Sequence, residues 1–244
     1  MNFSDRIKNV NPSMTLAIDA KAKEMKANGE DVIGFGAGEP DFNTPERIKQ
    51  AGIRAIENNE TRYTPVGGSD ALKNAIISKL QRDNGLTYEK NQILASCGAK
   101  HSFYNLAQVL WQADDEVIIP SPYWVSFPEI VTLAGARPVI IHAGAEQNFK
   151  IIPEQIDNAV TPNTKAIMIN SPSNPTGSAY DKYELEKLAE CALRHNLLII
   201  SDEIYEQIVF DDFRHTSIAS ISKEVQKQCV VINGVSKSYA MTGW

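Results

Sequence analysis

The chain has 244 residues, of which 43% are hydrophobic and 22% charged, and its formal net charge is −6. This composition can fill a sizeable core in one large domain or two modest ones. An acidic chain without a basic block is not typical of nucleic-acid-binding proteins, and no apolar run reaches the length of a membrane span. Three widely spaced cysteines without a CxxC pair favour a reducing compartment, so we expect a cytoplasmic protein. None of the four histidines falls at metal-ligand spacing, and we expect no metal.

The first part of the chain carries helix signals. Ser13 can cap a helix that runs to about residue 28. Thr44 and Pro45 suit the cap and first turn of a helix that continues to about residue 58. Ser69 opens a further helix, which the glycine at position 85 should end.

From residue 93 onward, short apolar runs alternate with helical stretches such as 100–110 and 181–195. Near-continuous apolar runs of this kind are typical of strands that are buried on both faces. The sequence therefore predicts an α/β fold with a mostly parallel sheet sandwiched by helices. The expected strands are residues 93–96, 116–120, 137–142, 166–170, 197–201 and 230–233.

Unusual residues follow several of these strands, and ligands bind at the carboxyl ends of strands in an open parallel sheet. Gly98, Ala99 and Lys100 follow the first strand, and small residues at a helix start expose backbone N–H groups that suit a phosphate. An ordinary tight turn explains this piece equally well. Trp124 follows the second strand, where it can provide a flat stacking surface or pack in the core.

Three later strands also end in polar side chains. Asn174 lies in a loop that two X-Pro steps and a glycine make rigid. Asp202 and Tyr205 are three residues apart, so one helical turn would put them on the same face; the acidic group could also be a helix cap or a metal site. Lys237 follows the last strand, where poor solvation favours a neutral amine that can react with an aldehyde.

One ligand accounts for all of these features. It is a phosphorylated aromatic aldehyde whose ring nitrogen needs a carboxylate and whose phenolic oxygen needs hydrogen-bond donors. An indole would stack on its ring, backbone amides would hold its phosphate, and a lysine would react with its aldehyde. The sequence therefore points to pyridoxal 5′-phosphate (PLP) as the cofactor.

Sequence strings along nearly the whole chain strengthen this interpretation. With them, the chain resembles the class I aminotransferases of the fold-type I PLP enzymes, and among these the bacterial aspartate aminotransferases. The strings are AGEPDF at 37–42, YTPVGG at 63–68, SPYWVS at 121–126, NPTG at 174–177, SDEIY at 201–205 and SKSYAMTGW at 236–244.

The resemblance implies a role for each residue that matches. Lys237 would hold the cofactor covalently and catalyse proton transfer, and Asp202 would contact the pyridine nitrogen. Tyr205 and Asn174 would bind the phenolic oxygen, and Trp124 would stack on the ring.

Further positions complete the implied site. Gly38 would lie near the substrate carboxylate, where Trp124 and Asn174 also contact the substrate, and Tyr63 would reach the phosphate bound by a neighbouring subunit, which implies a homodimer with shared active sites. The residues along the phosphate would be Gly98, Ala99, Lys100 and Ser236.

The resemblance also implies a domain division and an incomplete chain. Residues 1–44 would form an N-terminal arm with the first part of a small domain, and residues 45–244 a large PLP-binding domain cut short at its C-terminal side. The family continues with an arginine for the phosphate and, much later, another for the substrate carboxylate. We therefore expect this chain to be an N-terminal fragment that is incomplete for activity.

The expected reaction is transfer of an amino group between an amino acid and a 2-oxo acid, with aspartate and 2-oxoglutarate as the leading pair. Aromatic, prephenate or broader acceptors stay open. Alternatives are another reaction on the same scaffold, such as a carbon–sulfur β-lyase, a non-catalytic regulator with an aminotransferase-like domain, and an inactive remnant. Only about a dozen residues precede the first expected helix, which favours an enzyme over such a regulator, and the intact Lys237, Asp202, Tyr205 and Asn174 speak against a remnant.

Overall fold

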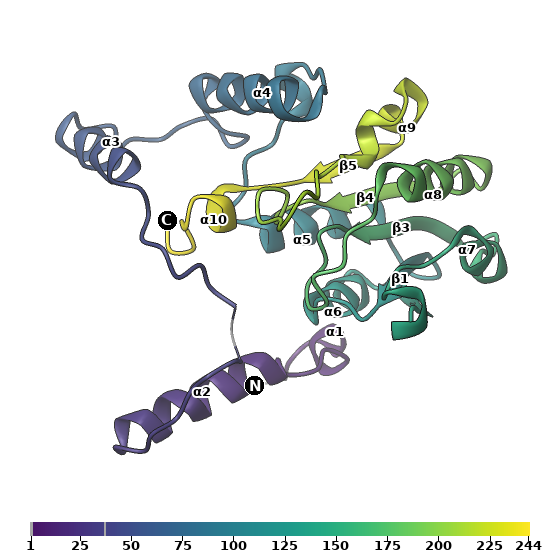
Figure 1. Cartoon of the computed structure of the whole chain (residues 1–244), viewed down its shortest axis with the longest axis horizontal. Coiled ribbons are helices and arrows are strands. Elements are labelled where there is room, and N and C mark those ends of the chain that lie inside the picture. The colour runs from purple at the N-terminus through teal and green to yellow at the C-terminus, as the bar shows by residue number, and fades with distance from the viewer. Residues whose placement is uncertain (1, 37) are drawn as a thin grey trace.

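The computed structural model describes residues 2–36 and 38–244, so Ala37 of the AGEPDF string lies outside the described residues. Helices lie on both sides of a central sheet (Figure 1). The α-helices are α1 (Asp5–Lys8), α2 (Met14–Ala27), α3 (Glu46–Glu57), α4 (Asp70–Asn84), α5 (Ala99–Leu110), α6 (Ser126–Leu133), α7 (Pro153–Ala159), α8 (Lys182–Arg194), α9 (Lys223–Lys227) and α10 (Val235–Ser238). Short 3₁₀ helices cover Lys90–Gln92, Ala145–Gln147 and Ile218–Ser220.

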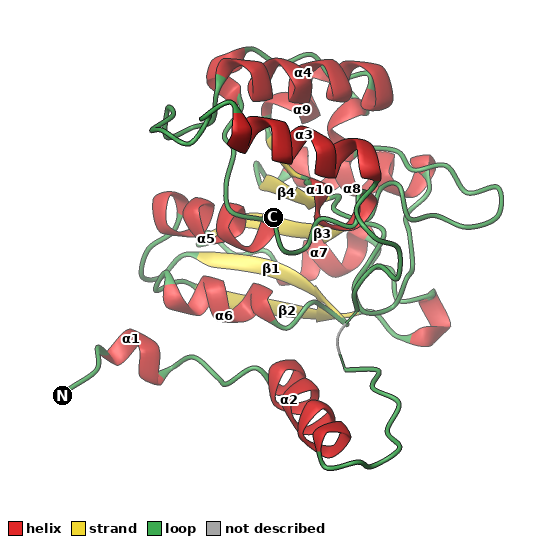
Figure 2. Cartoon of the chain, turned by 90° about the vertical axis from the view of Figure 1, so that its left-hand side faces the viewer, coloured by secondary structure: helices red, strands yellow, loops and turns green. Residues whose placement is uncertain are grey.

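The sheet contains five strands in the order β2-β1-β3-β4-β5, and every neighbouring pair is parallel. This confirms the predicted parallel sheet with helices on both faces (Figure 2). The register places Asn170 of β3 opposite Asp202 of β4, and Asp202 opposite Ile232 of β5. The strands are β1 (Glu116–Ser121), β2 (Arg137–His142), β3 (Thr164–Asn170), β4 (Leu198–Asp202) and β5 (Cys229–Ile232).

Alternate residues of the strands pack in two hydrophobic cores, one on each face of the sheet. Ile118 packs in a core that includes Leu185 of α8, whereas Val117 and Ile119 pack in a core that includes Phe103 of α5. Successive side chains of a strand point to opposite faces, so an apolar run fills both cores at once. This explains why the strands are nearly continuous apolar runs.

Three of the helix boundaries are confirmed by their caps. The Ser13 side chain accepts the Leu16 N–H at the start of α2, and the Ser69 side chain accepts the Leu72 N–H at the start of α4. Asp181 and Glu184 form a reciprocal capping box at the start of α8.

One cap prediction was wrong. Thr44 does not cap α3; the N-cap is Pro45. The Thr44 hydroxyl instead donates to the Ala240 carbonyl (2.5 Å) and accepts from Trp244 Nε1 (3.1 Å). The side chain is therefore already used to join the start of α3 to the segment after α10.

The first predicted strand, residues 93–96, is not a strand. These residues are linked to another segment by the Ala95 N–H, which donates to the Gly67 carbonyl (3.0 Å). Gly67 lies in a loop, and an apolar run becomes a strand only beside a partner strand. The other strand predictions are correct to within about two residues at their ends, as is usual for such boundaries.

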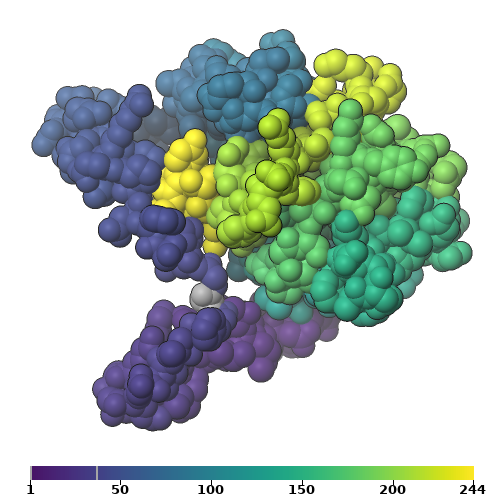
Figure 3. Space-filling model, viewed as in Figure 1, coloured from purple at the N-terminus to yellow at the C-terminus, as the bar shows by residue number. Residues whose placement is uncertain are grey.

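Helix α2 projects from the main body, whereas α1 lies against α6 (purple in Figures 1 and 3). No residue of α2 is buried, and Leu16 and Ile18 expose 67% and 54% of their surface. Asn11 connects this segment to α6, because its backbone and side-chain N–H groups both bind the Glu129 carboxylate (2.9 and 3.1 Å). Among the residues described, none of the helices combines the length and apolar character needed to cross a membrane.

The C-cap of α4 offers a test of the helix assignment. Gly85 has φ of 66°, in the left-handed region where a Cβ is strained, so Gly85→Ala should lower the free energy of unfolding by about 1 kcal/mol. No atom beyond its chain neighbours lies within 4 Å of the added Cβ, so the cost is conformational. Gly85→Asn is the matched control, because asparagine tolerates this conformation better. Equal losses for both variants in urea unfolding would contradict this explanation.

Candidate active site

The carboxyl ends of β3, β4 and β5 gather the polar residues that the sequence singled out. Because these strands are parallel and adjacent, the segments that follow them leave the sheet at one edge. Asn170 ends β3, Asp202 ends β4, and α10 with Lys237 follows β5 (Figure 1). The topology therefore brings together residues that are far apart in the sequence.

Asp202 is a buried carboxyl group, 5% exposed, at the end of β4. Its Oδ1 accepts the Ile204 N–H (3.2 Å), and no basic side chain in residues 2–36 or 38–244 forms an ion pair with it. Burial raises the pKa of Asp202 to about 7; the Ile204 hydrogen bond opposes this, and the Glu203 charge adds to it. The carboxyl group is thus positioned for a cationic partner that the described residues do not supply.

Lys237 lies on α10, and its amine reaches both a backbone carbonyl and an aromatic ring. The Nζ donates to the Gly38 carbonyl (3.0 Å) and lies 5.8 Å from the centre of the Tyr205 ring. The structure thus brings together three residues that the sequence analysis selected. Gly38 comes from the loop before α3, so the N-terminal segment also contributes to this group.

Tyr205 and Asn174 are joined to Asp202 by a short series of contacts. Burial raises the pKa of the Tyr205 phenol, the Asp202 charge adds to this, and a hydrogen bond with the Asn174 side chain opposes it. The Asn174 N–H donates to Asn170 Oδ1 (2.8 Å), and Asn170 Nδ2 donates to the Asp202 carbonyl (3.1 Å). Asn170 was missed in the sequence analysis, although a polar residue at the end of a buried strand is a recognisable signal.

Trp124 and Lys100 contact each other. The Lys100 Nζ lies 4.9 Å from the centre of the Trp124 ring, a cation–π distance. The Trp124 ring also packs edge-on against Phe127 with centroids 5.3 Å apart. The indole of Trp124 therefore packs on core residues and also lies beside a charged group, so the structure is compatible both with a core residue and with a stacking surface.

The start of α5 has the features expected of an anion-binding turn. Gly98 is the N-cap of α5 with φ of 82°, and the space at its missing Cβ is open beyond its chain neighbours. Ala99 is the first residue of this helix, whose first backbone N–H groups have no partner within the helix. His101 supports the turn, because its Nδ1 accepts the Cys97 N–H (3.1 Å).

The remaining predicted residues divide between this group and the surface. Ser236 is half-buried and precedes Lys237 on α10. Tyr63 is not brought to the group; it lies between α3 and α4, and its relative exposure is 107%. Within this chain, Tyr63 is therefore directed to solvent.

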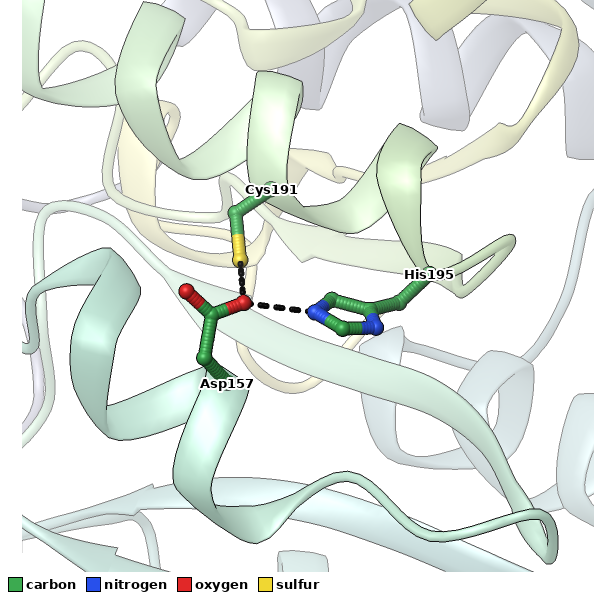
Figure 4. A group of neighbouring side chains, drawn as sticks. All are labelled: Asp157, Cys191 and His195. Atoms are coloured by element: carbon green, nitrogen blue, oxygen red, sulfur yellow. Dashed lines mark hydrogen bonds and ion pairs between the residues drawn. The ribbon is translucent and has the colours of Figure 1, made fainter.

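A second group of chemically active side chains lies between α7 and α8, where sequence spacing gave no sign of one. Asp157 of α7 faces Cys191 and His195 of α8 (Figure 4). Its carboxylate accepts two hydrogen bonds from Arg194 Nη2 (2.6 and 2.8 Å) and pairs with His195 Nε2 (2.5 Å). Contacts with His195 and then Arg194 lower the pKa of Asp157 to about 2, whereas burial raises the pKa of Cys191 to about 11. A guanidinium already neutralises the carboxylate, so this group is best explained as a link between two helices.

Comparison with known proteins finds relatives over nearly the whole chain. The family described as aminotransferase class I and II matches residues 30–244. The chain is 59% identical over 242 residues to the aspartate aminotransferase of Bacillus sp. (strain YM-2), and the match covers 99% of this chain and 62% of that protein.

Solved structures share the fold. An aspartate aminotransferase from Rhizobium meliloti superposes with a TM-score of 0.96 at 43% identity, and an aspartate aminotransferase from Thermus thermophilus with maleate gives 0.96 at 40% identity. Both matches cover 100% of this chain, and 61% and 63% of those chains. The chain thus spans about three fifths of the length of the relatives it matches. It belongs to the aminotransferase class I and II family, whose enzymes use pyridoxal 5′-phosphate.

Proposed function

We propose that the complete protein is an aminotransferase that moves the amino group of aspartate, or of a similar amino acid, to a 2-oxo acid, with 2-oxoglutarate as the leading acceptor. The observation that carries the proposal is the meeting of the Lys237 amine with Tyr205 beside the buried, unpaired carboxyl group of Asp202. The family match over residues 30–244 supports the same reaction class.

The residues present fit PLP. A carboxyl group buried without a cation is costly, and it becomes favourable when a cationic ring nitrogen lies against it. Tyr205 and Asn174 offer a hydroxyl and an amide beside Asp202. The open turn at Gly98 offers backbone N–H groups for the phosphate. These donors and the acceptor match the different parts of the cofactor.

Each residue then has a distinct task in holding the cofactor. Asp202 would hold the pyridine nitrogen in its protonated form, and Tyr205 and Asn174 would hydrogen-bond the phenolic oxygen. Trp124 would cover one face of the ring. The proposed residues along the phosphate are Gly98, Ala99, Lys100 and Ser236. When bound, PLP supplies an aldehyde for amines and an electron-withdrawing ring.

Lys237 would act as both the covalent attachment point and the proton carrier. Its Nζ would remove the α-proton of the amino acid and later return a proton. A general base must lie within hydrogen-bond reach of its proton, and a side chain held at one end by the Gly38 carbonyl can turn toward a nearby substrate. Asp202 would assist by keeping the ring nitrogen protonated, so that the ring withdraws electrons from the carbon that loses the proton.

The choice of aspartate rests on the relatives. The aspartate aminotransferases reported above share their name across both sequence and structural matches, and one was solved with maleate, a dicarboxylate. A dicarboxylic substrate pair, aspartate and 2-oxoglutarate, is therefore the leading proposal. Gly38, Trp124 and Asn174 would contribute the part of the substrate site that lies in this chain.

The proposal extends to assembly, location and domains. The full exposure of Tyr63 and the exposed apolar residues of α2 support a homodimer in which Tyr63 reaches the phosphate in the neighbouring subunit. Three cysteines without disulfides support the cytoplasm. Projection of α2 from the main body supports a division into residues 1–44 and a PLP-binding domain from residue 45 (Figure 3).

The Lys237 assignment is tested by Lys237→Ala in the full-length protein. The variant should lose the visible absorbance of lysine-bound PLP, and turnover should fall by a factor on the order of 10² to 10⁴, because the variant loses its general base. Lys227→Ala on α9 is the matched control and should keep both properties. Retained absorbance and turnover in Lys237→Ala would refute the assignment.

The Asp202 environment predicts a pH dependence. Because burial raises the pKa of Asp202 in the folded, cofactor-free protein to about 7, above its ordinary value of 3.8, folding favours the protonated form. Its destabilising effect is absent below about pH 4 and grows as the pH rises to about 7. The stability difference between Asp202→Asn and wild type should therefore rise across this window, to an order of a few kcal/mol.

Urea unfolding of both proteins between pH 4 and pH 8 measures this difference, and saturating PLP should reduce it. The exposed Asp212→Asn is the control and should show no such rise. A stability difference between Asp202→Asn and wild type that stays constant over the window would argue against an unpaired buried carboxyl group.

A further inference from the structure

The last residue of β4 and the turn that follows it carry three buried carboxyl groups with different surroundings. Asp202, Glu203 and Glu206 are 5%, 1% and 5% exposed. Buried carboxylates are costly unless they are paired or hydrogen-bonded. Side chains of the same chain hydrogen-bond Glu203 and Glu206. Asp202 has no such side-chain partner among the described residues and accepts the backbone N–H of Ile204.

Glu203 is bonded to a distant segment of the chain. Its Oε1 accepts the hydroxyls of Ser201 (2.9 Å) and Ser217 (2.8 Å), and its Oε2 lies 3.3 Å from His215 Nε2. Its backbone N–H also donates to the Ile232 carbonyl (2.8 Å) at the end of β5. The residue therefore joins β4, the end of β5 and segment 213–217 at the point where the turn begins.

Glu206 fixes the other end of the turn. Its carboxylate pairs with Lys79 and accepts Asn84 Nδ2 (2.9 Å), and both partners come from α4. Its backbone N–H donates to the Glu203 carbonyl (3.0 Å). The turn is thus held at both ends. Asp202 directly precedes Glu203, and Tyr205 lies between Glu203 and Glu206.

Glu203, Glu206 and His215 are also close enough together to suggest a cation site. Their partners argue against one. Two serine hydroxyls donate to Glu203, and the Lys79 ammonium group already neutralises Glu206. The group is complete as a hydrogen-bonded network, which leaves a positional role.

We propose that Glu203 is a positioning residue: by binding Ser201, Ser217 and His215 it fixes the turn that sets Asp202 and Tyr205 toward Lys237. Neighbouring side chains at a strand end point to opposite faces, so a carboxylate held on one face directs its neighbour to the other. The inference rests on the proposed function in taking Asp202 and Tyr205 as cofactor contacts. Misplacement of such contacts by about 1 Å can weaken function on the order of 10²-fold.

The test uses Glu203→Ala, Glu203→Gln and Ser217→Ala in the full-length protein, with the exposed Glu224→Gln of α9 as the control. The first measurement is the dissociation constant of PLP, taken well below the unfolding temperature of each variant. We expect Glu203→Ala to weaken PLP binding by about 10- to 100-fold. Glu203→Gln should retain most of the affinity, because an amide oxygen can still accept both serine hydroxyls. Ser217→Ala should fall between them, and the control should match wild type.

The second measurement is amide hydrogen exchange of the cofactor-free proteins. Exchange at residues 202–206 should quicken in Glu203→Ala and Ser217→Ala, with β1 and β3 unchanged. This arm does not use PLP, so it tests the positioning role even if the proposed function fails. Failure of the wild-type protein to bind PLP would count against the proposed function alone.

Two results would overturn the inference. One is wild-type PLP affinity in Glu203→Ala together with unchanged exchange of the turn, whatever its loss of stability. The other is a Glu203→Gln variant as weak as Glu203→Ala, because hydrogen-bond geometry would then not be the cause.

Discussion

Parallel pairing of β3, β4 and β5 is the constraint on which the proposed site depends. It brings the ends of all three strands to one edge of the sheet, so that Asn170, Asp202 and α10 meet although long stretches of sequence separate them. The two cores on the faces of the sheet hold this arrangement. A slip of one residue in the β4 register would turn Asp202 toward the opposite face and remove the carboxylate from the site.

The acidic turn after β4 divides its carboxyl groups between structure and chemistry. Glu203 and Glu206 are satisfied by serines, a histidine, a lysine and an asparagine of the same chain. Asp202 is left with a backbone hydrogen bond and a pKa raised to about 7. Two of these three buried acids are paired within the chain, and the third, at the strand end, is unpaired among the described residues. The unpaired carboxyl group can therefore bind a cationic group. An unpaired buried carboxyl group at this position is what a protonated pyridine nitrogen requires, which agrees with the resemblance to PLP enzymes.

The sequence predicted most of the sheet, and it selected Lys237, Tyr205 and Gly38, which the structure brings together. Apolar runs reveal strands that are buried on both faces, and cap residues such as Ser69 and Asp181 reveal helix starts. Residues 93–96 failed as a strand because strand formation depends on a neighbour, which periodicity does not report. Thr44 failed as a cap because its hydroxyl is taken by Ala240 and Trp244, which lie about 200 positions away.

The same limit applies to the site. Ser217 and His215 support the proposed cofactor contacts through bonds that connect distant segments, and spacing along the chain gives no sign of them. The Asp157, Cys191 and His195 group was missed for the same reason. Residues that touch a ligand often form local strings, whereas the residues that hold them in place are defined by the fold.

The central claim is that Lys237 is where this chain holds its cofactor. Reduction of the full-length protein with borohydride in the presence of PLP, followed by peptide mapping by mass spectrometry, tests it most directly. The account predicts that the cofactor mass is attached to the peptide that contains Lys237. Attachment to Lys100 or another lysine, or no attachment at all, would contradict it.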